Sequence, residues 1–190
     1  MSAAAQIVDL RSASDGKTKY QLRSTMDIAL WTLQVLCGVF FCVTGFGKLM
    51  CYRADVWNQT LHQPVAWFSA VPQGLFVFIG VCEFLGGVGL ILPAMTGVKQ
   101  KLTPFAAIGL TLVMVLAAVF HIVRGSEYNF LPINLVSAAV TAFIAYGRLI
   151  VTPIAPASIG VFRVMKGLAV LGALVLVSFA PVWYMLTHPH

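Results

Sequence analysis

The sequence predicts an all-α membrane protein, a four-helix transmembrane bundle with an additional fifth C-terminal transmembrane helix. Of its 190 residues, 59% are hydrophobic and only 9% are charged, and the mean hydropathy is +0.91. A soluble domain usually carries about 25% charged residues, so this chain has too few to cover a surface that faces water. The hydrophobic residues gather in long runs without the alternation of barrel strands, which leaves helices as the structure that satisfies the backbone in lipid.

Five hydrophobic runs define the expected spans. They extend from Ile28 to Met50, from Gly74 to Leu92, from Thr103 to Val123, from Pro132 to Tyr146 and from Ile159 to Met185. A span needs about 20 residues, so the fourth run is marginal unless it extends to Ile150. The chain therefore divides into a polar cytoplasmic tail (1–26), a four-helix bundle (27–150) and an extra C-terminal helix (151–190).

The segment that precedes the first run, Met1 to Arg23, is polar and rich in small residues. It lacks the hydrophobic core of a signal peptide. We therefore expect a mobile tail, with the first span serving as its own insertion signal.

The basic residues indicate how the spans are oriented. If the N-terminus is cytoplasmic, nine of the twelve Lys and Arg residues face the cytoplasm, namely Arg11, Lys17, Lys19, Arg23, Lys99, Lys101, Arg148, Arg163 and Lys166. The remaining three, Lys48, Arg53 and Arg124, lie on the other side. This bias follows the positive-inside rule, and it puts the C-terminus outside. In this interpretation Arg124 and Arg148 set topology and anchor the helices at the lipid headgroups.

The longest connector, Cys51 to Gln73, carries Trp57, Trp67 and Phe68 among polar residues. Because tryptophan favours the membrane interface, we expect an interfacial segment that lies across the outer mouth of the bundle. A plain aqueous loop is the alternative.

Small and polar residues share helix faces in three of the spans. Gly38 and Gly45 align in the first span, and Gly80, Glu83 and Gly87 align in the second. The fourth span has a face made of Asn134, Ser137, Ala138, Thr141, Ala142 and Ala145. Such faces let membrane helices approach closely, so they should point into the bundle. The fifth run is nearly uniform in Leu, Val and Ala, which is typical of a peripheral helix.

The polar residues near the outer half of the spans form the candidate functional site. Its five members are Lys48, Glu83, His121, Glu127 and Asn134. One hypothesis is a polar pocket that opens outward and either binds a quinone headgroup or passes protons, because ionisable residues inside membranes often mark pathways. The other hypothesis is an internal ion pair or hydrogen bond that sets the register of the helices. Lys48 and His121 also lie close enough to the interface to extend toward it.

Several other functions find no support in the sequence. The formal charge of +6 comes from basic residues in short connectors, so it indicates membrane topology and no nucleic-acid partner. The four cysteines form no CxxC pair, and no spacing suggests a metal site. No nucleophile–base pair or phosphate-binding loop appears either, so catalysis by this chain itself stays an open question.

The sequence resembles the DoxX-like family of small bacterial membrane proteins over about residues 31 to 148. The matching stretches include Gly45 to Leu49, Ile79 to Gly97, Leu102 to Pro104, Val113 to His121, Gly125 with Glu127, and Asn134 to Arg148. The resemblance implies a four-helix bundle in the bacterial inner membrane. The polar tail and the fifth run depart from the family's pattern.

What the resemblance implies about function is a place in membrane redox chemistry. Relatives of DoxX include a subunit associated with thiosulfate:quinone oxidoreductase. We therefore expect a membrane subunit of a quinone-linked oxidoreductase system, surrounded by lipid and by other membrane subunits, with a quinone as the possible cofactor. The alternative is a non-catalytic structural or assembly subunit of a larger membrane complex. A small-molecule permease is a weaker third possibility, because no internal repeat is evident.

Overall fold

The computed structural model describes residues 3–61, 66–97, 99–125, 128–155 and 161–187. These residues form helices and no strand. The elements are α1 (Ala3–Met50), α2 (Ala54–Leu61), η1 (Ala66–Ala70), α3 (Gln73–Thr96), α4 (Leu102–Arg124), η2 (Tyr128–Phe130), α5 (Leu131–Tyr146), η3 (Gly147–Val151) and α6 (Val161–Thr187). The all-α class predicted from the sequence is therefore confirmed.

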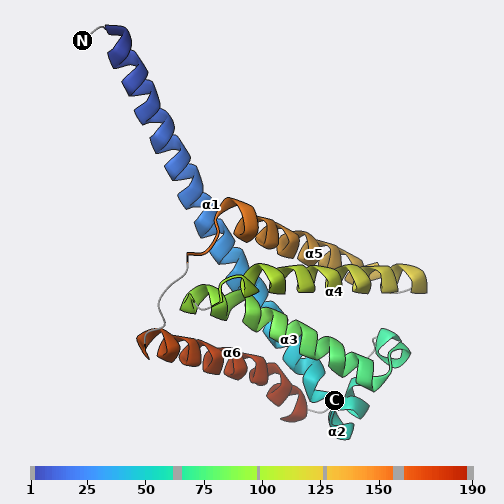
Figure 1. Ribbon diagram of the computed structural model, residues 1–190. Coiled ribbons are helices and arrows are strands. Elements are labelled where there is room, and N and C mark those ends of the chain that lie inside the picture. The colour runs from blue at the N-terminus through green and yellow to red at the C-terminus, as the bar shows by residue number, and fades with distance from the viewer. Residues whose placement is uncertain (1–2, 62–65, 98, 126–127, 156–160, 188–190) are drawn as a thin grey trace.

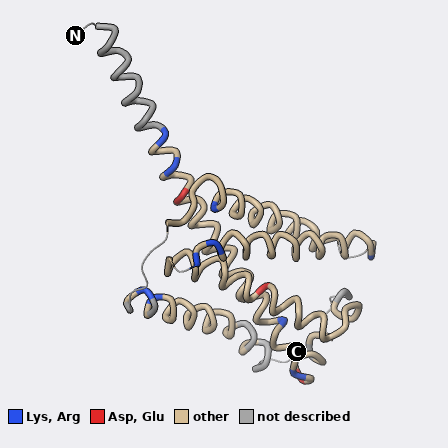
Figure 2. Tube along the Cα trace, in the orientation of Figure 1, with Lys and Arg blue, Asp and Glu red and all other residues tan. Residues whose placement is uncertain are grey.

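Four of the helical segments are long and apolar enough to cross a membrane. They are Lys19–Met50, Gln73–Thr96, Leu102–Arg124 and Tyr128–Val151. The last segment joins η2, α5 and η3, which confirms that the fourth run extends past Tyr146. Large apolar side chains such as Phe78, Leu112 and Leu116 are exposed, as expected for faces that contact lipid instead of water. Charged positions are sparse along the packed helices (Figure 2).

The four helices pack in the order α1, α3, α4, α5, and the long α1 passes the end of α5 before it runs along α3 (Figure 1). Helix α6 lies against α1 and α3, away from α4 and α5 (Figure 1). The core between the helices is built from large buried side chains that include Phe41, Leu90, Leu110 and Ile144. This arrangement places the end of α1 beside the start of α3, and the middle of α1 beside the end of α5.

The polar tail is helical, and its mobility stays a prediction. Helix α1 begins at Ala3 and continues without a break into the first span, so it extends well beyond the bundle (Figure 1). The tail contains no proline and is rich in Ala, Gln, Lys, Arg and Leu, all of which favour helix. Once the first span is helical, each further turn adds hydrogen bonds without the cost of a new nucleus.

A fifth transmembrane helix is not supported, which corrects the second part of the predicted fold. The apolar stretch described within α6 is Met165–Ala180, shorter than the four candidate spans. Helix α6 nevertheless packs on the bundle. Leu174 and Ser178 are buried, and Phe179 makes an edge contact with Phe46 of α1.

Glycines bring α1 and α3 into close contact, as the predicted faces indicated. A Cβ atom on Gly87 would lie 2.6 Å from the carbonyl oxygen of Gly38, and one on Gly80 would lie 2.8 Å from that of Gly45. No side chain fits at these distances, so the two backbones can touch only because these residues are glycine. The predicted faces of α3 and α5 are buried as expected, except that Ala142 is exposed.

The connector folds back over the start of α3. The rings of Trp57 in α2 and Phe68 in η1 lie 5.5 and 5.6 Å from the ring of Phe76. Cys51 and Val71 are buried in the same small cluster. The connector is therefore a packed cap on one end of the bundle, and its position at the membrane interface stays a prediction.

Candidate functional site

Lys48 and Glu83 form an ion pair between α1 and α3. The Lys48 Nζ atom lies 2.5 Å from Glu83 Oε2, and the two side chains are 18% and 4% exposed. Gly80, one turn before Glu83, permits this contact, because a Cβ atom there would lie 2.7 Å from the Cβ atom of Lys48. Lys48 thus reaches into the bundle to Glu83 instead of extending to the interface.

Burial makes each of these two charges expensive unless the other is present. An ionised carboxylate in a low-dielectric interior is stable only with a paired and hydrogen-bonded partner. Lys48 supplies both the opposite charge and the donor for Glu83. The pair is therefore neutral as a whole, and its two charges compensate each other inside the bundle.

The other predicted site residues lie on α4 and α5 or beyond them. His121 is buried in the last turn of α4, with its ring stacked on Phe130 and edge-on to Phe120, both at 5.5 Å between centroids. Asn134 is buried near the start of α5. Glu127 lies outside the described residues. The structure thus joins Lys48 to Glu83 directly, and the grouping of all five residues in one pocket stays a prediction.

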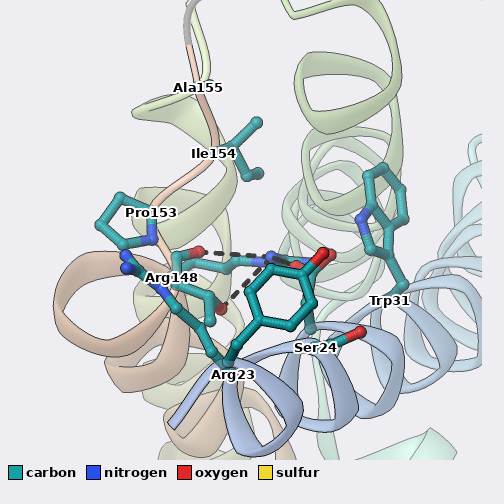
Figure 3. A pocket seen from close by; sticks show the side chains of 10 residues that line it. Arg23, Ser24, Trp31, Arg148, Pro153, Ile154 and Ala155 are labelled. Carbon is teal, nitrogen blue, oxygen red and sulfur yellow. Dashed lines mark hydrogen bonds and ion pairs between the residues drawn. The ribbon is translucent and has the colours of Figure 1, made fainter. Parts of the chain in front are cut away.

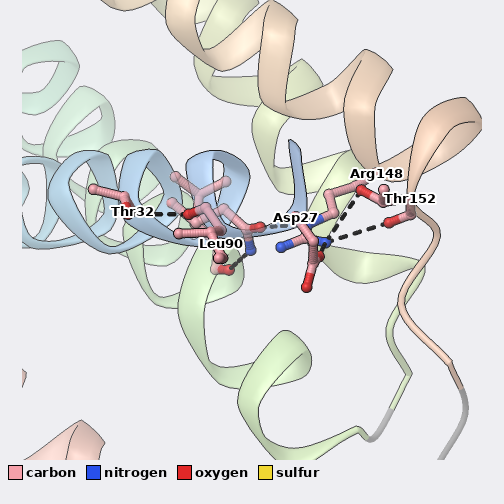
Figure 4. Close-up of polar contacts among 7 residues, drawn as sticks. Asp27, Thr32, Leu90, Arg148 and Thr152 are labelled. Atoms are coloured by element: carbon pink, nitrogen blue, oxygen red, sulfur yellow. Dashed lines mark hydrogen bonds and ion pairs between the residues drawn. The ribbon is translucent and has the colours of Figure 1, made fainter. Parts of the chain in front are cut away.

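Arg148 is the centre of a second buried cluster that the sequence analysis missed. Its side chain is 1% exposed, although we expected a headgroup anchor. Its Nε donates to Gln34 Oε1 at 2.5 Å, and its Nη1 pairs with the carboxylate of Asp27 and contacts the carbonyl oxygen of Thr152 at 3.3 Å (Figure 4). Gln34 in turn donates to the carbonyl oxygen of Leu90 at 3.0 Å. These bonds tie α1, α3 and η3 together at one end of the bundle.

The local structure explains how an arginine enters the bundle here. The chain after Tyr146 winds into a π-helical turn, closed by a 2.8 Å hydrogen bond from the Thr152 amide to the Gly147 carbonyl. A Cβ atom on Gly147 would overlap the side chain of Leu30, so glycine lets this turn lie directly on α1. Such π turns are rare and occur often at functional sites. A signal existed in the sequence, because Asp27 and Gln34 lie seven residues apart on one face of the first span.

A pocket of about 380 Å³ opens beside the Arg148 cluster (Figure 3). Its polar lining comes from α1, through Tyr20, Arg23, Ser24 and Asp27, and from Arg148 and Thr152. Trp31, Pro153, Ile154 and Ala155 supply its apolar lining. The guanidinium carbon of Arg148 lies 5.3 Å from the centre of the Trp31 ring, a cation–π contact that holds the arginine head at the pocket wall.

The model of the DoxX-like family matches residues 32–144, which is more than half of the chain. The chain belongs to the DoxX-like family. The match confirms the resemblance drawn from the sequence. No curated protein and no solved structure matches the chain significantly.

The DoxX-like region contains all five predicted site residues and leaves out most of the Arg148 cluster. Lys48, Glu83, His121, Glu127 and Asn134 all lie between residues 32 and 144. Asp27 and Arg148 lie just outside the two ends of the match, as does the whole of α6. The Lys48–Glu83 pair therefore belongs to the part shared with the DoxX-like family, whereas the pocket is built mainly from residues that flank it.

Proposed function

We propose that this DoxX-like protein is a membrane subunit of a quinone-linked oxidoreductase system, and that Glu83 and Lys48 carry a proton in it. The observation that supports this proposal most strongly is the buried ion pair between α1 and α3, at 2.5 Å. Acids inside membrane helices are costly and commonly mark pathways for protons or ligands. The proposal also rests on the redox association of relatives of DoxX.

The chemistry required of such a subunit is proton delivery. Reduction of a quinone to its quinol takes up two electrons and two protons. A partner oxidoreductase subunit would supply the electrons, and the Lys48–Glu83 pair would supply one of the two protons and then take up a proton from water. His121 is buried near the same end of the bundle. It is our candidate for the group that supplies the second proton.

The main alternative is a non-catalytic structural or assembly subunit of a larger membrane complex. The observation in its favour is that the ion pair adjoins the glycine contact of α1 with α3, where Gly45 and Gly80 touch. In this role Lys48 and Glu83 would only fix the register of the two helices. Buried ionic groups serve this purpose in some other helical assemblies.

Replacement of Glu83 by Gln separates the two proposals. The Gln side chain keeps the shape and a hydrogen-bonding group but removes the charge and the titrating proton. If Glu83 carries protons, the E83Q variant assembles normally and loses quinone-linked turnover or shifts its pH dependence. If the pair is only structural, E83Q keeps full turnover with an unchanged pH profile. The abundance of the native complex and its turnover across pH measure both outcomes.

Two further variants calibrate the experiment. The E83L variant removes the partner of Lys48 altogether, so it should lower assembly more than E83Q does, since a buried donor is left unsatisfied. The T111V variant removes the 2.9 Å hydrogen bond between Thr111 and Thr141, a membrane polar contact with no titrating proton. Such contacts contribute about 0.6 kcal/mol on average. T111V therefore shows the effect of losing one interhelical hydrogen bond that involves no ionisable group.

We also propose the location and orientation that the charges favour. The protein lies in the bacterial inner membrane with its N-terminus in the cytoplasm and its C-terminus on the opposite side. The support is that Arg148 packs against α1 near Asp27, while Gln100 in the α3–α4 turn donates to Ala155 at 3.2 Å. The α3–α4 turn with Lys99 and Lys101 and the η3 segment with Arg148 therefore lie at one end of the bundle. The positive-inside rule favours the cytoplasmic side for this end.

A further inference from the structure

We propose that the pocket lined by Arg23, Asp27, Trp31 and Arg148 binds an anionic phosphate group at the end of the bundle where α1 meets η3. This proposal is independent of the quinone-linked function. The phosphate could belong to a lipid headgroup or to a free phosphate compound, and both would meet the same set of donors.

The charge of the pocket favours an anion. Its lining contains two guanidinium groups, from Arg23 and Arg148, and one carboxylate, from Asp27. The lining therefore carries one net positive charge before a ligand enters. The hydroxyl groups of Tyr20 and Ser24 add neutral donors on the same face of α1.

Arg148 presents an unused donor in this setting. Its Nε and Nη1 atoms are occupied by Gln34, Asp27 and Thr152, whereas its buried Nη2 atom has no hydrogen-bond partner. A buried donor without a partner costs free energy, and a charged one costs more. A phosphate oxygen entering from the pocket would satisfy Nη2 once the side chains that cover this atom shift, and the planar guanidinium group suits phosphate oxygens well.

The remaining walls define the shape of the ligand. Trp31 lies beside the guanidinium group of Arg148, and Ile154 supplies apolar lining at a separate place in the pocket (Figure 3). Arg23 is exposed, so it can close on a bound phosphate from the open side. The pocket therefore offers one rigid buried cation, one adjustable exposed cation and an apolar surface for the carbon atoms that carry the phosphate.

The test compares two variants of the full-length protein with the same change of charge. The R23Q variant removes the exposed cation of the pocket. The K19Q variant is the matched control, because Lys19 is an exposed cation one turn earlier on α1 that does not line the pocket. Binding is measured for two probes in detergent at constant ionic strength, inorganic phosphate by calorimetry and phosphatidylglycerol by native mass spectrometry. Phosphatidylcholine, which carries the same phosphate diester without net charge, is the lipid control.

We expect R23Q to weaken binding by about tenfold, since charge-assisted hydrogen bonds are worth more than neutral ones, while K19Q binds as the unaltered protein does. Selective loss for phosphatidylglycerol identifies a lipid headgroup as the source, and selective loss for inorganic phosphate identifies a free phosphate compound. Equal loss in R23Q and K19Q, or no binding of either probe, would overturn the proposal.

A second variant tests the same site from the opposite direction. Asp27 competes with the ligand for Arg148, so D27N should strengthen phosphate binding and increase the rise in thermal unfolding midpoint that the bound probe produces. Unchanged or weaker binding in D27N would contradict the proposed role of Arg148.

Discussion

Lys48 and Arg148 lie inside the helical bundle, and each pairs with a carboxylate from a different element. Lys48 of α1 pairs with Glu83 of α3, and Arg148 of η3 pairs with Asp27 of α1. Removal of one partner from a buried pair typically costs about 3–5 kcal/mol, because the other charge stays buried alone. The two pairs differ in exposure, since the Asp27 carboxylate is 46% exposed and that of Glu83 only 4%.

Replacement of Arg148 by Lys should destabilise the protein although it conserves the charge. A lysine cannot donate to Gln34 and Asp27 at once in the planar arrangement that Arg148 adopts. The expected loss is about 1–3 kcal/mol of unfolding free energy, the usual cost of an unsatisfied buried polar group. Thermal unfolding in detergent measures it. The R124K control changes an exposed arginine and should stay within ~0.5 kcal/mol. Equal stability of R148K and R124K would show that simultaneous donation to Gln34 and Asp27 does not stabilise the protein.

Cys51 should react slowly with thiol reagents. Its side chain is buried at the start of the connector, and burial raises the pKa of the thiol, against smaller opposing effects of the Thr60 hydroxyl and of Lys48. Because the thiolate is the reacting form, a raised pKa moves the onset of reactivity to higher pH. Maleimide labelling across pH measures this.

The control for Cys51 is Tyr52→Cys in a background in which the four native cysteines are replaced, because Tyr52 is the exposed neighbour. This thiol should react at lower pH and faster than Cys51 does in a second variant that keeps Cys51 and replaces the other three native cysteines. Equal rates at all pH values would mean that the connector opens readily.

At the scale of helices, the contact between α1 and α3 depends on glycine. A Cβ atom on Gly80 would lie 2.7 Å from Lys48 Cβ and 2.8 Å from the Leu49 amide nitrogen, where it would meet backbone. The G80A variant should therefore lose about 1–3 kcal/mol of stability through overpacking. It should also move Lys48 away from Glu83.

The matched variant for G80A is G109A on α4, where an added Cβ atom meets nothing within 4 Å. Alanine favours helix over glycine by roughly 0.5–1 kcal/mol, so G109A should be neutral or stabilising. Thermal unfolding of both variants compares them. If G109A were destabilised as much as G80A, the loss in G80A could not be attributed to the close contact between α1 and α3.

Over the whole molecule, the arrangement of charge predicts which end faces the cytoplasm. A cysteine introduced at Arg53 in the connector should be labelled from outside in intact cells. A cysteine introduced at Lys101, in the α3–α4 turn, should be labelled only after permeabilisation. Both positions are exposed, so accessibility decides the result. Labelling of position 101 in intact cells would reverse the proposed orientation.

Local sequence properties were enough to predict the four spans, the buried faces and the burial of Glu83. Hydropathy and helical period depend on residues within a few turns of one another, so they can be read without knowing where any helix lies. The same properties did not predict that the polar tail continues the first helix, and the fifth span that they predicted is not supported by the described residues.

The partners of the buried charges were decided by tertiary structure. Lys48 meets Glu83 across 35 residues of sequence, and Arg148 meets Asp27 across 121. Which side chains meet depends on how closely two helices approach and on their rotation, which the glycine contacts and the π turn at Gly147 determine. The sequence alone therefore showed that Glu83 must have a partner, because a lone acid in lipid is too costly. Only the packed helices showed that Arg148, placed by sequence at the surface, turns inward and builds a pocket.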